Sequence, residues 1–246
     1  MAGQGEMERG CGFAQGAAEC LRDMLGLFFP DPCAGCGLPL PGTGIPVCPQ
    51  CLHQLPRTGF ESMAVNPVEK LFRGRLPLQS ACSLFYFSRG SAIQSMIHTL
   101  KYHQAPELGH FLGRQMGEAL RLSGSYGNTL AIVPLPLSRQ KQQVRGYNQA
   151  ERLAAGMGEV MGLPVLNNLV EKERSNQSQT RKNRTDRWTH MSGTFRARPE
   201  NLAPYPELLL VDDVVTTGAT LEACGKALLG SGLDRLHLVT LAFADR

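Results

Sequence analysis

The chain has 246 residues, of which 42% are hydrophobic and 19% charged, and its formal net charge is +4. This composition fits a globular protein with one large domain, or one medium domain with a small attachment. The charge is too weakly basic to name nucleic acid as a partner, and no apolar run approaches the roughly 18 residues of a membrane helix. We therefore expect no membrane insertion.

The first segment, residues 1–19, contains five glycines and little apolar content. Such a composition predicts a disordered tail. The tail also lacks a basic segment followed by an apolar one, which is the pattern of a secretory signal. We therefore expect a cytoplasmic location, in which thiols stay reduced.

Residues 20–60 are expected to hold a short helix that ends at Pro30, followed by a small metal-binding unit. Two C-x-x-C pairs, separated by eleven residues, are formed by Cys33, Cys36, Cys48 and Cys51. Each pair presents two sulfurs from a tight turn, and four soft ligands suit a tetrahedral zinc ion. Because protein atoms fill all four positions, the predicted zinc is structural and not catalytic. Disulfides are the alternative for these cysteines.

After an expected linker over residues 61–80, regular elements are predicted in a second domain over 81–246. Apolar runs predict four strands, and stripes at helical spacing predict four helices. The strands are expected at 82–88, 129–136, 207–211 and 236–243, and the helices at 93–100, 108–120, 148–162 and 217–229. Strands that alternate with helices indicate an α/β fold, a mostly parallel sheet flanked by helices on both faces.

The stretch LLLVDDVVTTGAT, residues 208–220, places Asp212 and Asp213 after a buried strand and a Gly/Thr turn before a helix. The unpaired N–H groups and positive dipole at a helix amino terminus favour an anion such as phosphate. Gly218 allows a close backbone approach, and the two carboxylates can accept hydrogen bonds from the vicinal hydroxyls of a sugar. The alternative is that both acids only begin the helix.

This stretch closely resembles the 5-phosphoribosyl 1-pyrophosphate (PRPP) motif of type I phosphoribosyltransferases. The resemblance implies that Asp212 and Asp213 bind the ribose 2′- and 3′-hydroxyls, with Asp213 also a catalytic residue and Mg²⁺ bound together with PRPP. It also implies that one loop wraps the 5′-phosphate, formed by Thr216, Thr217, Gly218, Ala219 and Thr220.

A second block, residues 132–154, resembles the ComF family, whose members pair a zinc ribbon with a phosphoribosyltransferase-like domain. Within it, residues 145–149 read R-G-Y-N-Q, close to the family's R-G-F-N-Q. The resemblance implies that Arg139 contacts pyrophosphate and that Arg145 is catalytic. It covers residues 21–246 and implies a type I phosphoribosyltransferase-like parallel sheet with a small amino-terminal zinc ribbon.

Two further basic features are expected near this site. Residues 174–198 hold seven Lys or Arg and only one acid, which suits a cationic flap that closes over a phosphorylated substrate, with Arg187 matching the family pattern. The alternative is a solvated basic loop. Lys101 resembles the lysine of a Lys-Tyr pair at the end of a family helix and is expected to bind substrate, and the alternative is a surface lysine.

Three functions fit these features. The first is a phosphoribosyltransferase, a pentosyl-transferring glycosyltransferase of nucleotide metabolism, with an acceptor that supplies its own nucleophile. The second is a non-catalytic PRPP sensor. The third, which the family name implies, is an accessory of DNA uptake and competence that contacts single-stranded DNA or competence and recombination proteins.

Overall fold

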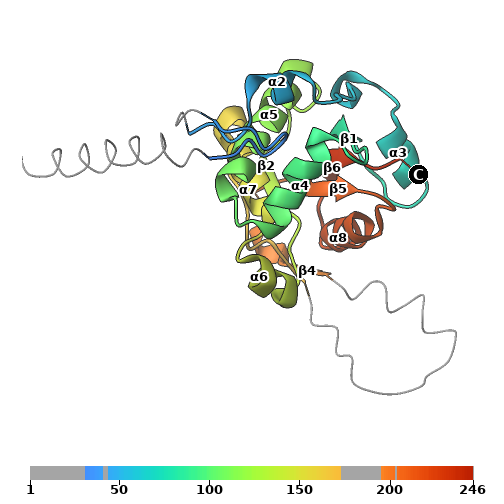
Figure 1. Ribbon diagram of the computed structural model, residues 1–246. Helices are drawn as coiled ribbons and strands as arrows, with labels where there is room; N and C mark the ends of the chain where they lie inside the picture. Colours follow the sequence, from blue (N-terminus) through green and yellow to red (C-terminus); the bar gives the residue numbers. More distant parts are fainter. Residues whose placement is uncertain (1–30, 41–43, 173–194, 203, 246) are drawn as a thin grey trace, which may run out of the picture.

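The computed structural model describes residues 31–40, 44–172, 195–202 and 204–245 (Figure 1). Its elements are α2 (Pro49–His53), η1 (Phe60–Ser62), α3 (Pro67–Phe72), β1 (Ser80–Tyr86), α4 (Ala92–Tyr102), α5 (Pro106–Ser123), β2 (Ala131–Pro134), α6 (Arg139–Arg145), α7 (Gln149–Met161), β3 (Val170–Lys172), β4 (Phe195–Ala197), η3 (Pro199–Asn201), β5 (Glu207–Val215), α8 (Ala219–Gly230) and β6 (Arg235–Phe243). The expected disordered tail, the helix before Pro30 and residues 174–194 of the cationic flap lie outside the described residues.

The centre of the fold is a four-stranded sheet in the order β1-β6-β5-β2. All three neighbouring pairs are parallel. The predicted α/β fold with a parallel sheet is therefore confirmed. Because the strands are parallel, their carboxyl ends meet at one edge of the sheet, where such folds bind ligands.

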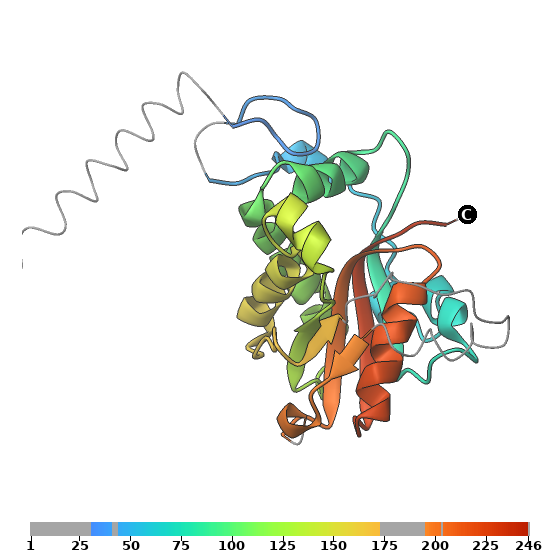
Figure 2. The same cartoon turned by 90° about the horizontal axis from the view of Figure 1, so that it is seen from below.

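Both faces of the sheet are covered, which explains why β5 begins as a nearly continuous apolar run. Residues 208–211 of this strand are completely buried. Helices α5 and α7 lie over one face, and α8 lies over the other (Figure 2). In the part of the chain that the structure describes, no helix combines the length and the apolar character needed to cross a membrane.

The structure differs from the sequence prediction before β1. The sequence predicts a linker over 61–80, and within this range the structure forms the last two residues of η1 and the helix α3. Phe60, Val68 and Phe72 are almost fully buried in the main core. They were missed because so few apolar residues, each separated by polar ones, give no clear period. The division of the chain into domains stays a prediction.

Candidate functional site

The sequence predicts Asp212 and Asp213 directly after a buried strand, but the structure places both inside the carboxyl-terminal half of β5. Strand β5 extends to Val215, and Asp212 pairs with Thr240 of β6. On the other side, Val211 pairs with Pro134, the last residue of β2. The acids are therefore held in a strand that pairs with β6 and lie just beyond the end of β2, which fixes their direction better than a loop would.

Asp213 is nearly buried, with 7% of its surface exposed, and its charge is compensated by a lysine from another element. The Nζ atom of Lys101, in the last turn of α4, lies 3.0 Å from Oδ2 of Asp213. Lys101 thus points into the group of acids and is not a free surface lysine. Its role as a substrate-binding residue stays a prediction.

Asp212 has an unusual ionisation equilibrium. Burial of its carboxyl group and the neighbouring carboxylate of Asp213 raise the pKa of Asp212 to about 8. Three groups act in the opposite direction: the backbone N–H of Asp213, which donates to Oδ1 at 2.8 Å, and the charges of Lys101 and Arg145. Paired carboxylates with shifted pKa values are typical of functional sites.

The turn after β5 has the features of an anion site. Gly218 is the N-cap of α8 and adopts φ +71°. Residues with a Cβ atom disfavour this backbone conformation. The hydroxyl-bearing residues of the turn, Thr216, Thr217 and Thr220, are exposed. Among the described residues, no backbone carbonyl accepts a hydrogen bond from the N–H groups of Thr216, Thr217 or Gly218. These donors are available to a bound ligand.

The R-G-Y-N-Q block joins the site's elements. Asn148 is the N-cap of α7, and its Nδ2 donates to the carbonyl of Leu135, directly after β2. The hydroxyl of Tyr147 donates to the carbonyl of Leu100 in α4. The block therefore ties the lysine-bearing end of α4 to the edge of the sheet that carries the acids.

The two arginines of this region differ in their surroundings. Arg145 donates to Oε1 of Gln149 at 2.7 Å and lies over the ring of Tyr102 at 5.8 Å. It is close enough to Asp212 to influence its ionisation. Arg139 is exposed at the start of α6, a helix that buries none of its residues. Arg187 lies outside the described residues.

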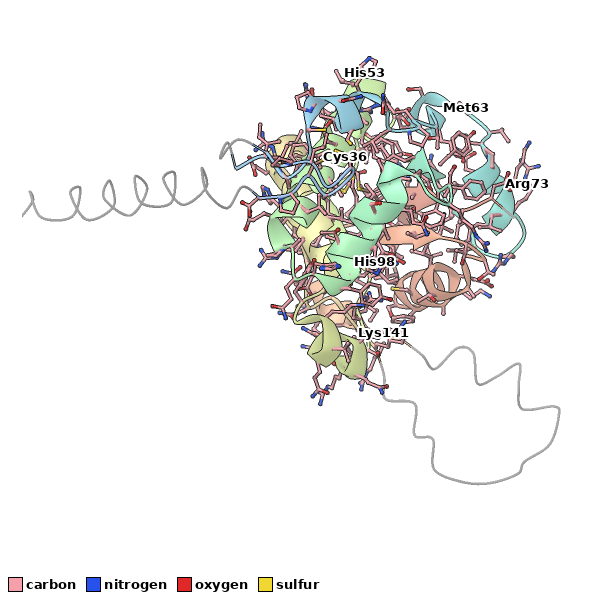
Figure 3. The ribbon with its side chains drawn as sticks, in the orientation of Figure 1. Cys36, His53, Met63, Arg73, His98 and Lys141 are labelled. Carbon is pink, nitrogen blue, oxygen red and sulfur yellow. The ribbon has the colours of Figure 1, made fainter. Side chains whose placement is uncertain are left out.

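Lys172, at the end of β3, belongs to the same region and was not found from the sequence. Burial and the charge of Lys141 lower the pKa of Lys172, and the charge of Asp212 acts against this shift. Its Nζ lies 5.1 Å from the centre of the Phe195 ring. Lys141 itself projects from α6, below α4 in the view of Figure 3. A three-residue strand gives no periodic signal, so nothing local marked Lys172.

The four predicted zinc ligands come together. The sulfur atoms of Cys33, Cys36, Cys48 and Cys51 all lie within 4.8 Å of one another. The Sγ atoms of Cys36 and Cys48 are 3.9 Å apart. Four sulfurs bound at about 2.3 Å to one tetrahedral zinc stand about 3.8 Å apart. The donor set and its spacing therefore fit a structural metal ion, and the cysteines are free thiols and not disulfides.

Local hydrogen bonds favour the thiolate that a metal requires. Burial of the Cys33 thiol acts against ionisation, but backbone N–H groups of Cys48, Cys36 and Gly35 outweigh it and lower the pKa of Cys33 to about 6. Two of these donors lie 3.3 and 3.4 Å from the sulfur. The ribbon also packs on the main domain, because a Cβ at Gly35 would meet Met96 of α4 at 3.0 Å.

Comparison with known proteins identifies relatives of this chain, although no protein-family model matches it. Competence protein F of Haemophilus influenzae is 36% identical over 115 residues, which are 46% of this chain and 50% of that protein. Competence protein ComFC of Bacillus subtilis is 35% identical over 101 residues, 41% of this chain and 39% of that protein. DNA utilization protein YhgH of Salmonella typhimurium is 26% identical over 203 residues, 81% of this chain and 78% of that protein.

The matches to the two competence proteins span half or less of each relative's length, while the match to the DNA utilization protein is longer and more distant. The features that carried the resemblance are present in the structure. The cysteine cluster precedes a parallel α/β sheet, and the R-G-Y-N-Q block joins β2 to α7. The chain is therefore similar to competence protein F, ComFC and DNA utilization protein YhgH, in line with the ComF resemblance of its sequence.

Proposed function

We propose that this chain binds PRPP together with Mg²⁺ at the carboxyl end of β5 and is a phosphoribosyltransferase-like protein. The observation that supports the proposal is the position of Asp212 and Asp213 in the strand directly before the Gly218 turn. The acids accept hydrogen bonds from the ribose 2′- and 3′-hydroxyls. The N–H groups and hydroxyls of residues 216–220 hold the 5′-phosphate.

The cationic side chains near the acids support the other end of the substrate. Lys101 pairs with Asp213, and the charges of Arg145 and Lys172 reach Asp212. These cations, with Arg139, stabilise negative charge on the pyrophosphate, and Mg²⁺ neutralises more of it. Positioning and charge stabilisation are then the main sources of catalysis.

In the proposed reaction, the bond between C1′ and the pyrophosphate oxygen breaks, and pyrophosphate leaves with the electron pair. A nucleophilic nitrogen of the acceptor forms the new bond at C1′ through an oxocarbenium-like transition state. The acceptor supplies this nucleophile. Binding without transfer is the second form of the proposal, in which the same site acts as a PRPP sensor.

Calorimetric titration with PRPP and Mg²⁺ tests the binding site. The double variant Asp212→Asn, Asp213→Asn is expected to lose binding, while Asp234→Asn, which changes an exposed acid between α8 and β6, is expected to retain it. Equal affinity in the double variant and the wild type would refute the site. Release of pyrophosphate that needs an added acceptor separates the transferase from the sensor.

A role in DNA uptake is a second candidate, favoured by the relatives named competence proteins and DNA utilization protein. In the structure, α6 buries none of its residues and carries Arg139, Lys141 and Arg145. We expect single-stranded DNA to bind there, with an affinity that falls as salt rises. Replacing Arg139 and Lys141 by Ala should reduce the salt slope by about 0.7 per lost phosphate contact. A double Ala variant of Lys70 in α3 and Arg73 at its C-cap, both exposed, is the control.

A further inference from the structure

The proposed phosphate turn has a partner outside the PRPP motif. Arg75 follows α3 and approaches the turn from a segment more than 140 positions earlier in the sequence. Its Nη1 donates to the carbonyl of Thr217 at 2.9 Å and to the carbonyl of Leu71 at 3.1 Å. Its Nε donates to Oε2 of Glu222, also at 2.9 Å. One guanidinium thus joins α3, the turn and the first turn of α8.

The bond to Thr217 fixes the direction of a peptide group that the proposed ligand needs. In a trans peptide, the C=O and the following N–H point in opposite directions. Because Arg75 holds the carbonyl of Thr217, the N–H of Gly218 points away from Arg75. In the described part of the chain, that N–H donates to no backbone carbonyl. Arg75 thereby keeps a donor of the turn directed away from the protein segment behind it.

The bond to Glu222 balances a negative charge close to the proposed phosphate site. Glu222 is an acid in the first turn of α8, next to the end of the helix where a phosphate is proposed to bind. A carboxylate there would repel a second anion. Lys226 and Arg75 both bind the carboxylate, and together they hold the pKa of Glu222 below its usual value. The acid can therefore remain in place as an anchor for Arg75.

The same segment also forms the floor below the turn. A Cβ at Gly218 would lie 2.6 Å from Cζ of Phe72 and 3.4 Å from Cδ2 of Leu71. The guanidinium of Arg75 lies 5.8 Å from the centre of the Phe72 ring. The aromatic ring and the cation therefore support the turn from one side, and the N–H of Gly218 faces the other.

We propose that Arg75 is a positioning residue for the phosphate turn, acting on the Gly218 N–H through the Thr217 carbonyl. The inference rests on the proposed function and deepens it, because it adds a residue from outside the motif to the 5′-phosphate site. It also distinguishes two parts of one substrate. Arg75 hydrogen-bonds to the turn proposed to hold the 5′-phosphate, and the cations proposed for pyrophosphate come from other elements.

The test is calorimetric titration of wild type, Arg75→Lys and Arg75→Gln with Mg²⁺ and three probes: PRPP, ribose 5-phosphate and pyrophosphate. A lysine cannot bind the Thr217 carbonyl and Glu222 with the same fork. Both variants are expected to bind PRPP and ribose 5-phosphate at least about tenfold more weakly, the effect of roughly 1.4 kcal/mol. Their affinity for pyrophosphate is expected to be unchanged. Arg73→Lys is the control, since Arg73 is exposed and projects outward in Figure 3.

A second comparison separates the carbonyl contact from simple charge neutralisation. Glu222→Gln removes the charge that Arg75 balances, so the double variant Arg75→Gln, Glu222→Gln keeps the loss only if the Thr217 contact matters. We expect the loss to persist. Recovery of wild-type affinity, or equal weakening of pyrophosphate and ribose 5-phosphate, would overturn the positioning role.

The two proposals fail in different ways. If the wild type does not bind PRPP, the proposed function falls and the role of Arg75 falls with it. Thermal denaturation shows whether the Arg75 variants are folded. If the wild type binds PRPP and the folded Arg75 variants bind it equally well, only the role of Arg75 falls.

Discussion

Lys101 Nζ lies 3.0 Å from Oδ2 of Asp213, and this ion pair joins the last turn of α4 to the carboxyl end of β5. The side chains are 21% and 11% exposed, so neither charge is well solvated. A charge in such a place is costly once its partner is removed. The pair therefore stabilises the fold at the proposed PRPP site.

The first prediction concerns this pair. Lys101→Met should lower the free energy of unfolding by about 1–3 kcal/mol, because it leaves Asp213 without its cation. Asp213→Asn in the Lys101→Met background should recover part of the loss. Urea denaturation measures both, with Lys70→Met at an exposed position of α3 as control. A cost for Lys101→Met no larger than that of the control would contradict the prediction.

The second prediction follows from Asp212. Its pKa is about 8 in the folded protein, far above the usual 3.8, so the folded state favours the neutral form. This contribution to stability is complete at acidic pH and is lost as the pH rises to about 8. The Asn side chain of an Asp212→Asn variant does not ionise, so this variant loses no such stability as the pH rises.

The stability advantage of Asp212→Asn over wild type should therefore grow between pH 5 and pH 8 and then level off. We expect the change to be on the order of 1 kcal/mol or more, the effect of one pKa unit. Urea denaturation at pH 5, 7 and 9 measures it, with Asp234→Asn as an exposed control. A constant difference across this range would show that Asp212 is ionised throughout.

The third prediction concerns the metal. Cys36 is the exposed member of the cluster, so Cys36→Ser removes a ligand with little effect on packing. The wild type should hold one zinc per chain, and the variant should lose it. Its Tm should fall by at least about 4 °C, the shift that roughly 2 kcal/mol produces in a protein of this size.

Metal analysis by mass spectrometry and thermal denaturation with and without chelator give the two measurements. His53→Ala is the control, because His53 is an exposed residue of α2 near the ribbon (Figure 3). Four cysteines complete the ligand set, so this variant should keep its zinc. Full zinc content in Cys36→Ser would exclude the predicted ligand set.

The parts of the fold that could be predicted were those with local signals. The run at 207–211 and the Gly/Thr turn after it identified β5 and the start of α8, because burial on both faces and a positive φ each leave a mark in the sequence. The two C-x-x-C pairs predicted the cysteine cluster for the same reason, because each turn defines its own geometry.

The parts that were missed depend on distant contacts. The contacts of Phe72 and Arg75 with the phosphate turn depend on the position of α3 below Gly218, which lies almost 150 residues later in the chain. Lys172 joined the site through a hairpin of three-residue strands. No spacing rule connects such residues, because tertiary packing and not local periodicity brings them together.

The fourth prediction tests the floor of the phosphate turn. Gly218→Ala should destabilise the fold by about 1–3 kcal/mol more than Gly232→Ala. Both glycines have positive φ values, +71° and +98°, but only a Cβ at Gly218 meets Phe72, at 2.6 Å. The difference between the variants therefore isolates the clash. Adding Phe72→Leu to Gly218→Ala should recover part of the stability in urea denaturation, and equal costs for the two glycines would argue against this contact.

The last prediction concerns the helix pair that supports the R-G-Y-N-Q block. Gly156 of α7 packs directly on the backbone of α5, where a Cβ would lie 2.1 Å from the carbonyl oxygen of His110. Alanine normally stabilises a helix by about 1 kcal/mol relative to glycine, yet here backbone atoms block it and the helices must separate. Gly156→Ala should therefore cost about 3 kcal/mol or more in urea denaturation, and Gly230→Ala in α8, with open space around it, should cost nothing. Because Asn148 caps α7 and holds the end of β2, the same variant should weaken PRPP binding in its folded fraction, whereas a neutral Gly156→Ala would contradict the observed helix crossing.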